Sequence, residues 1–421
     1  MQSQINVAAT RGLNPLVACF GLALLDRAIL DALCRALDIS FYQAIQSNIV
    51  GIETELTPDL AGLDIDRFPG SLKPAPRIAV RHTVGLVDAI TAEDLVSRVN
   101  DGLPETLAEA IDFYGCSYFK LKVSGVPKQD LSRLRRIAST LDRLPHYVVT
   151  LDGNEQFPDA AAAAAFWRQV QAPPELKRLV AATLYIEQPP PRANTLNTDV
   201  TVRSDAAPAL IDEADNTIDA FVQGIAHGYT GVSSENCKGF YRSLLNAARC
   251  RTLNVDGGPR YFMSAEDLTT QAGLAVQQDL ALVNLLGLTH VERNGHHYVD
   301  GFAGRAPAAM NSRPFWRRSP GSTRPAATTC ALLSITARSI CLRYRQSASQ
   351  PAPIRLGRPC GRWRSARAND NKCSTVGASY FALTYFRQLC DSLNPSTSRA
   401  FLFDSGASNS PSSRLIGMPG Q

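Results

Sequence analysis

The segment YFKLK, residues 118–122, opens the stretch of sequence that decides the fold. Three comparable segments follow it, VVTLD at 148–152, LYIE at 184–187 and ALIDE at 209–213. Each is a short apolar run that ends in charged residues, and such runs are typical of strands buried on both faces of a parallel sheet. The charged residues would then lie at the carboxyl edge of the sheet, where α/β barrels carry their chemistry.

Strand and helix patterns alternate through residues 78–305, which we assign to one (β/α) barrel domain. We expect strands at Val84–Asp88, Tyr118–Val123, Tyr147–Asp152, Thr183–Glu187, Ala209–Asp212, Gly231–Ser234, Thr252–Val255 and Leu288–Glu292. Helical patterns separate most of them, including a capped segment at 91–99 and an alanine-rich one at 159–171. Eight strands alternating with helices predict a closed barrel rather than an open sheet.

The chain of 421 residues is long enough for more than one domain. Residues 1–77 form the first, mainly helical part: apolar residues recur at helical spacing from 14 to 38, and prolines and glycines crowd residues 50–78. Residues 306–421 contain 16 lysines and arginines but only three acidic residues. We expect this basic tail to be disordered and not to bind nucleic acid. Its composition resembles that of a segment translated in a shifted reading frame.

The first five cysteines, up to Cys250, form no CxxC pair, which makes a zinc ribbon or a disulfide framework unexpected. The sequence starts without a signal peptide pattern, and its apolar stretch at 16–25 is too short to span a membrane. We therefore expect a cytoplasmic enzyme with no membrane partner.

Three carboxylates stand at the ends of successive predicted strands: Asp152, Glu187 and Asp212. They are 35 and 25 residues apart, close to the roughly 30 residues of one β/α unit in a barrel of about 250. Hard oxygen ligands with room for water and substrate describe a Mg²⁺ site. The alternative is that each carboxylate only caps the helix that follows it.

Lys120 and Lys122 lie on the same face of their strand, because strand side chains alternate with a period of two. Two charges buried under a helix would be costly, so we place both in the barrel interior. Crowded positive charge lowers the pKa of a lysine and suits it to act as a base. The alternative is a pair of surface lysines at the mouth of the strand.

The set KLK at 120–122, LDGNEQF at 151–157, YIEQP at 185–189 and IDEA at 211–214 resembles the enolase superfamily, in its mandelate racemase and muconate-lactonizing-enzyme branch. The resemblance covers residues 14–305 and implies a (β/α)₇β barrel with an α+β capping domain, here partial. It implies Mg²⁺, with Mn²⁺ as a substitute, held by Asp152, Glu187 and Asp212. It also implies Lys122 as the base, with Lys120 tuning that base or touching the substrate.

The implied reaction removes the proton α to the carboxylate of a small-molecule substrate and gives an enediolate, as in racemases or epimerases, cycloisomerases and dehydratases. The sequence leaves both the substrate and a homo-oligomeric state open. It departs from the family pattern where a strand-six lysine is expected: Glu235 stands there, and Lys238 fits a later lysine. The strands that open the capping domain are also missing. The alternative is a catalytically impaired barrel that retains a metal site.

Overall fold

The computed structural model describes residues 2–200, 207–255, 258, 260–268 and 274–295. The predicted tail at 306–421 lies outside the described residues.

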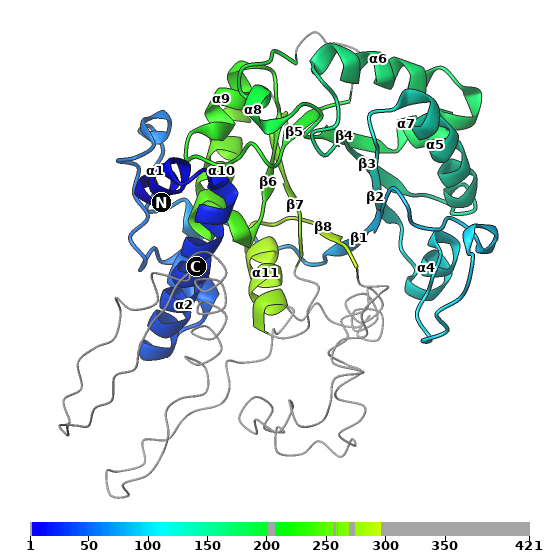
Figure 1. Cartoon of the computed structure of the whole chain (residues 1–421). Helices are drawn as coiled ribbons and strands as arrows, with labels where there is room; N and C mark the ends of the chain where they lie inside the picture. The colour runs from blue at the N-terminus through cyan, green and yellow to red at the C-terminus, as the bar shows by residue number, and fades with distance from the viewer. Residues whose placement is uncertain (1, 201–206, 256–257, 259, 269–273, 296–421) are drawn as a thin grey trace, which may run out of the picture. The chain divides into compact units, whose positions relative to one another are not determined.

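Eight parallel strands close into a barrel in sequence order, as predicted (Figure 1). They are β1 (Ala79–Val84), β2 (Tyr118–Lys122), β3 (Val148–Asp152), β4 (Thr183–Glu187), β5 (Ala209–Ile211), β6 (Gly231–Ser234), β7 (Phe262–Ala265) and β8 (His290–Arg293). The barrel closes where Ala79 of β1 pairs with His290 of β8. All carboxyl ends therefore lie at one rim of the barrel.

Several of the helices begin at residues that satisfy their terminal backbone groups. The helices are α1 (Gln2–Thr10), α2 (Pro15–Ala36), α3 (Phe41–Gln46), α4 (Leu107–Tyr114), α5 (Pro127–Leu141), α6 (Ala160–Gln171), α7 (Lys177–Ala181), α8 (Arg192–Thr195), α9 (Ala220–Ala226), α10 (Phe240–Leu253) and α11 (Leu274–Leu285). The described residues also contain the 3₁₀ turns η1 (Pro58–Leu60), η2 (Pro69–Ser71), η3 (Ala92–Asp94), η4 (Pro174–Leu176) and η6 (Asn236–Lys238). Asn14 caps α2 by accepting from the Leu16 N–H, and Asp159 caps α6 by accepting from the Ala162 N–H.

Two predicted strands were placed wrongly. The first strand is β1 at 79–84 and not 84–88, because Arg81 and His82 interrupt its apolar pattern: Arg81 points into the polar barrel interior, and His82 packs against Phe119. The seventh is β7, whose Ser264 also breaks the pattern, and Thr252–Val255 instead covers the end of α10 and the turn after it. The capped segment at 91–99 is only the 3₁₀ turn η3.

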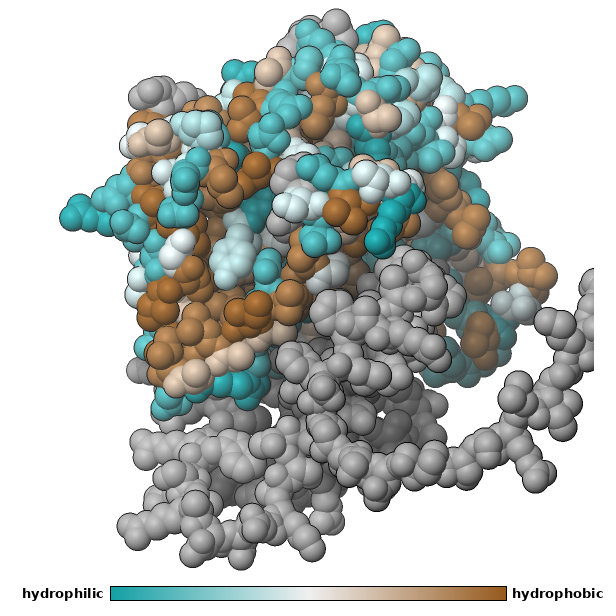
Figure 2. Space-filling model, turned by 60° about the vertical axis from the view of Figure 1, so that its left-hand side comes forward, coloured by the Kyte–Doolittle hydropathy of each residue, from teal (hydrophilic) through white to brown (hydrophobic). Residues whose placement is uncertain are grey.

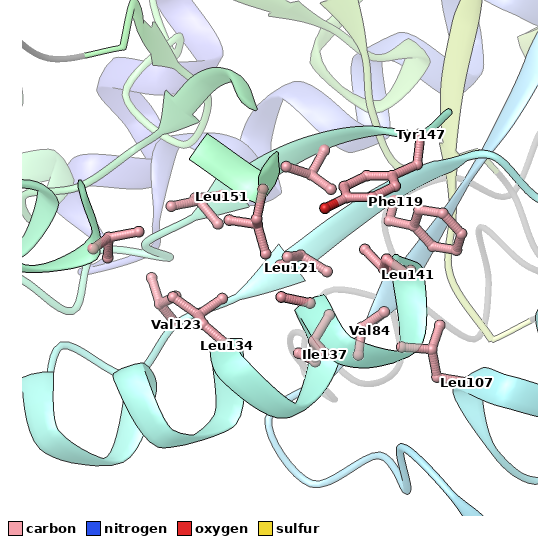
Figure 3. Close-up of a cluster of buried hydrophobic side chains, with 14 of the residues drawn as sticks. Val84, Leu107, Phe119, Leu121, Val123, Leu134, Ile137, Leu141, Tyr147 and Leu151 are labelled. Atoms are coloured by element: carbon pink, nitrogen blue, oxygen red, sulfur yellow. The ribbon is translucent and has the colours of Figure 1, made fainter. Parts of the chain in front are cut away.

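The largest apolar cluster fills the space between the barrel wall and the helices α4, α5 and α6 (Figure 3). Phe119 and Leu121 of β2 are fully buried there against Leu134 and Leu141 of α5. Burial of each such side chain stabilises the fold by roughly 1.5–3 kcal/mol. Because Phe119 and Leu121 face the helices, the alternating lysines of β2 face the barrel interior, as the sequence predicts.

The helical residues before the barrel pack on its β6–α10 side, where α2 contacts η6 and α10. Cys19 of α2 is fully buried there, and Arg242 of α10 reaches its sulfur. The outer face of α2 keeps Leu25 and Ile29 more than half exposed, and Figure 2 shows apolar side chains gathered on the side of the molecule that it brings forward. Among the described residues, no helix combines the length and the apolar character needed to cross a membrane.

Candidate active site at the barrel rim

The carboxyl ends of neighbouring strands bring the predicted site residues to one rim. Lys122 of β2 is in register with Asp152 of β3, which is in register with Glu187 of β4. Asp212 follows directly after β5, and its backbone N–H donates to the Gln188 side-chain oxygen at 2.9 Å. The even spacing of the motifs along the chain thus becomes adjacency around the barrel.

Lys120 lies at the centre of this cluster. Its ammonium donates to Glu187 Oε1 at 2.7 Å and to Glu266 Oε2 and Glu292 Oε2 at 3.0 Å each. Asp152 Oδ2 lies 2.9 Å from the same nitrogen. Burial lowers the pKa of Lys120, but these carboxylates together raise it well above its ordinary value. Lys120 is therefore a permanent buried cation.

Lys122 is the more accessible lysine of the pair, with 20% of its side chain exposed against 2% for Lys120. Its ammonium donates to Asp152 Oδ2 at 2.5 Å. Burial and Lys120 lower its pKa, but Asp152, Glu292 and Glu187 outweigh them, so the pKa is raised. This differs from the lowered pKa expected from the sequence, because carboxylates surround the two lysines.

Lys238 and Asp212 form a second buried pair. The Lys238 ammonium donates to the Asp212 backbone oxygen, to Asp212 Oδ1 and to Ser233 Oγ, each at 2.6 Å. Glu235 Oε1 lies 3.1 Å from the same nitrogen, and the Cys237 thiol donates to Glu235 Oε2 at 2.8 Å. Burial, followed by the charge of Asp212, raises the pKa of Glu235 well above its ordinary value. Both residues of the predicted strand-six motif are thus buried in one network.

A third group of interior side chains centres on Arg81, which sequence reasoning missed. Its guanidinium bonds to Glu266 Oε1 and donates to the Tyr185 hydroxyl at 2.6 Å and to Ser264 Oγ at 2.8 Å. His290 Nδ1 lies 2.9 Å away, and burial, then Arg81, lowers the pKa of His290 to about 4. Glu266 joins this group to Lys120. The available signal was a charged residue, Arg81, in the middle of a short apolar segment.

Acidic side chains outnumber basic ones at this rim. Burial, followed by neighbouring carboxylates, raises the pKa of Glu187 well above its ordinary value and raises the pKa of Glu213 to about 7. Within the described part of the chain, Glu187 Oε2 is a buried oxygen without a hydrogen-bond partner. Crowding and burial thus favour the protonated form of several of these carboxyl groups.

The expected metal ligands do not fit Mg²⁺ in this arrangement. Across the described ranges, no three His, Cys, Asp or Glu side chains are placed so that they could hold a metal ion. The Lys120 ammonium lies between Asp152 and Glu187, and Lys238 holds Asp212 apart in its own network. Oxygen donors of the right chemistry are present, but lysine ammonium groups occupy the space among them.

Solved structures similar to this chain are of mandelate racemase/muconate lactonizing proteins and other enolase-superfamily members. One from Paracoccus denitrificans has 17% identity and a TM-score of 0.42, over 65% of this chain and 71% of that one. The 3,6-anhydro-D-galactonate cycloisomerase from Zobellia galactanivorans has 17% identity and a TM-score of 0.41, over 65% and 70%. The muconate lactonizing enzyme from Klebsiella pneumoniae has 22% identity and a TM-score of 0.37, over 52% and 54%.

The chain spans little more than half the length of the Klebsiella enzyme and of a mandelate racemase/muconate lactonizing protein from Herpetosiphon aurantiacus, of which it covers 56%. No protein-family model matches the chain, and no curated protein matches it in sequence. At these identities and TM-scores the likeness assigns neither an activity nor a substrate.

Proposed function

We propose that the chain is an enolase-superfamily enzyme of the mandelate racemase and muconate-lactonizing-enzyme branch, an isomerase or lyase that removes the α-proton of a small-molecule carboxylate in the cytoplasm. The observation that carries the proposal is the position of Lys122. Its amine lies at the carboxyl end of β2, beside Asp152, and is partly open to solvent, whereas Lys120 and Lys238 are each 2% exposed. Lys122 is the amine among these three that a substrate can reach.

The proton step uses residues of the chain. A neutral Lys122 amine takes the α-proton, and the electron pair of the broken C–H bond moves onto the substrate carboxylate to give an enediolate. Returning a proton to the α-carbon gives racemisation or epimerisation, and loss of a β-substituent gives dehydration. Because Asp152 raises the pKa of Lys122, the amine becomes available as the pH rises or as Asp152 finds another partner.

Mg²⁺ at Asp152, Glu187 and Asp212, with Mn²⁺ as a substitute, belongs to the proposal through the resemblance of the motifs. Its binding requires Lys120 and Lys238 to release these carboxylates.

A second candidate is a catalytically impaired barrel that retains its carboxylate cluster. The specific observation in its favour is Glu235, which is 4% exposed and bonded within the Lys238 network at the end of β6. β6 stands opposite β2 in the closed order of eight strands. A carboxyl group there cannot act as the second amine of a lysine pair.

The deciding experiment measures α-proton exchange in D₂O for a panel of 2-hydroxy acids, sugar acids and dipeptides, with the full chain at millimolar Mg²⁺. The proposal expects exchange that Lys122→Met removes and that Ser124→Ala, a change close to the same strand end, preserves. Lack of exchange for every panel member in a folded protein that binds Mg²⁺ would favour the impaired barrel.

A further inference from the structure

The contacts of Lys120 match the donor capacity of an ammonium group. A lysine ammonium has three N–H donors, and Lys120 makes three hydrogen bonds, to Glu187, Glu266 and Glu292. The contact with Asp152 is an ion pair at 2.9 Å beyond those three bonds. One nitrogen therefore gathers four carboxylates from β3, β4, the end of β7 and β8.

Such a ring of carboxylate oxygens is also the environment that a hard divalent cation selects. All four carboxyl side chains are at most 1% exposed, so any charge that they carry needs an internal partner. The unpartnered Glu187 Oε2 adds a buried oxygen that the single charge of Lys120 leaves unused. With the ammonium in place, no three of the acidic side chains in the described residues are placed to hold a metal ion, so a cation could bind here only if Lys120 withdrew.

We propose that the Lys120 ammonium and a divalent cation are alternative occupants of the cluster formed by Asp152, Glu187, Glu266 and Glu292. Lys120 is then a built-in competitor, which holds the barrel rim together without a metal and weakens the binding of one. The inference rests on these contacts and not on the catalytic proposal.

Competition has a measurable consequence. If the metal-competent arrangement is a minor population, the apparent dissociation constant equals the intrinsic one divided by that population. The wild-type chain is then a weak, millimolar binder. Removing the Lys120 ammonium removes the competitor and tightens binding at least about tenfold, if the competent population is roughly a tenth or less.

The test is a Mn²⁺ titration of the full chain, with free Mn²⁺ followed by electron paramagnetic resonance. The variants are Lys120→Met and, as the matched control, Lys122→Met. Both lose one positive charge and gain the same side chain, but Lys122 contacts Asp152 from the open side and leaves the cluster filled. The expected result is at least tenfold tighter binding for Lys120→Met than for either wild type or Lys122→Met.

Equal affinities of wild type and Lys120→Met would overturn the proposal, as would an equal gain in Lys122→Met. Lys120→Met leaves buried carboxylates unpaired, so its folding is measured by thermal unfolding with and without Mn²⁺, and a rise in melting temperature confined to this variant supports competition. If Lys120→Met folds neither with nor without Mn²⁺, the Mn²⁺ affinity of the wild-type chain tests the proposal. Micromolar Mn²⁺ binding by the wild type contradicts the inference and millimolar binding supports it, whichever way the proton-exchange experiment turns out.

Discussion

Replacing Glu266 by glutamine tests whether the barrel interior is held by charge. Glu266 bonds to the Arg81 guanidinium and to the Lys120 ammonium, and the side chains of Glu266 and Arg81 are 1% and 0% exposed. Burial raises the pKa of Glu266, but Arg81 and then Lys120 outweigh it and hold the pKa well below its usual range. Glutamine keeps the shape and can still accept from Tyr185 or Ser264, so the substitution removes mainly the charge.

Breaking a buried ion pair by removing one partner lowers the free energy of unfolding by roughly 3–5 kcal/mol. Arg81 keeps the neutral acceptors Tyr185 and Ser264, and Lys120 keeps its other carboxylates. We therefore expect the lower end of this range, about 3 kcal/mol. With a urea dependence of about 1–3 kcal/mol per molar, the unfolding midpoint falls by about 1 M or more.

The assay is urea unfolding followed by far-ultraviolet circular dichroism. Glu213→Gln is the matched control, because Glu213 is a half-buried rim carboxyl whose pKa is raised to about 7, so the substitution loses little charge stabilisation near neutral pH. Adding Arg81→Met to Glu266→Gln should recover part of the loss. A loss below about 1 kcal/mol, or one no larger than that of Glu213→Gln, would refute the reasoning.

Three further outcomes follow from the same geometry. Burial raises the pKa of Glu213 to about 7, so this group binds more protons in the folded chain than in the unfolded chain between about pH 4 and pH 7. The free energy of unfolding should therefore fall as pH rises through this window. Glu213→Gln should make this pH dependence weaker, which urea unfolding at several pH values measures. Lys122→Met should lower α-proton exchange by about 10²–10⁴-fold. The wild-type rate should rise with pH, because the raised pKa keeps the amine protonated at neutral pH, and a rate independent of pH would argue against Lys122 as the base. Glu235→Lys places an amine at the end of β6, opposite β2, and should add α-proton exchange of the second enantiomer. Mass spectrometry of each enantiomer in D₂O measures this, and unchanged selectivity would argue against a role for position 235 in the proton transfer.

Much of the fold follows from local patterns. The apolar runs around Leu121 and Leu151 specify β2 and β3 because both faces of these strands are buried, and the helix at 15–36 follows from its spacing and its Asn14 cap. β1 and β7 were not predicted at their positions because each carries a polar residue that faces the barrel interior. Arg81 of β1 donates a hydrogen bond to Ser264 of β7, so neither strand is an unbroken apolar run in the sequence.

The sequence predicts which strand ends carry the charged residues, but it does not predict the contacts that these residues make. Periodicity places Lys120 and Lys122 on the interior face, and the motif spacing places Asp152 and Glu187 beside them. The partners of Lys120 come from residues 146 and 172 positions later in the chain, Glu266 and Glu292, and no local pattern reports such contacts. The direction of the lysine pKa shifts depends on these distant carboxylates, which is why the sequence predicted it wrongly.

The most direct test of which cation occupies the carboxylate cluster is a crystal structure. Crystals are grown in submillimolar Mn²⁺, and anomalous data are collected at the manganese edge. We predict the Lys120 nitrogen within hydrogen-bond distance of Glu187, Glu266 and Glu292, and no anomalous peak among them. A manganese peak bound by Asp152 and Glu187, with the Lys120 side chain turned away, would contradict the placement of Lys120 as the resident cation.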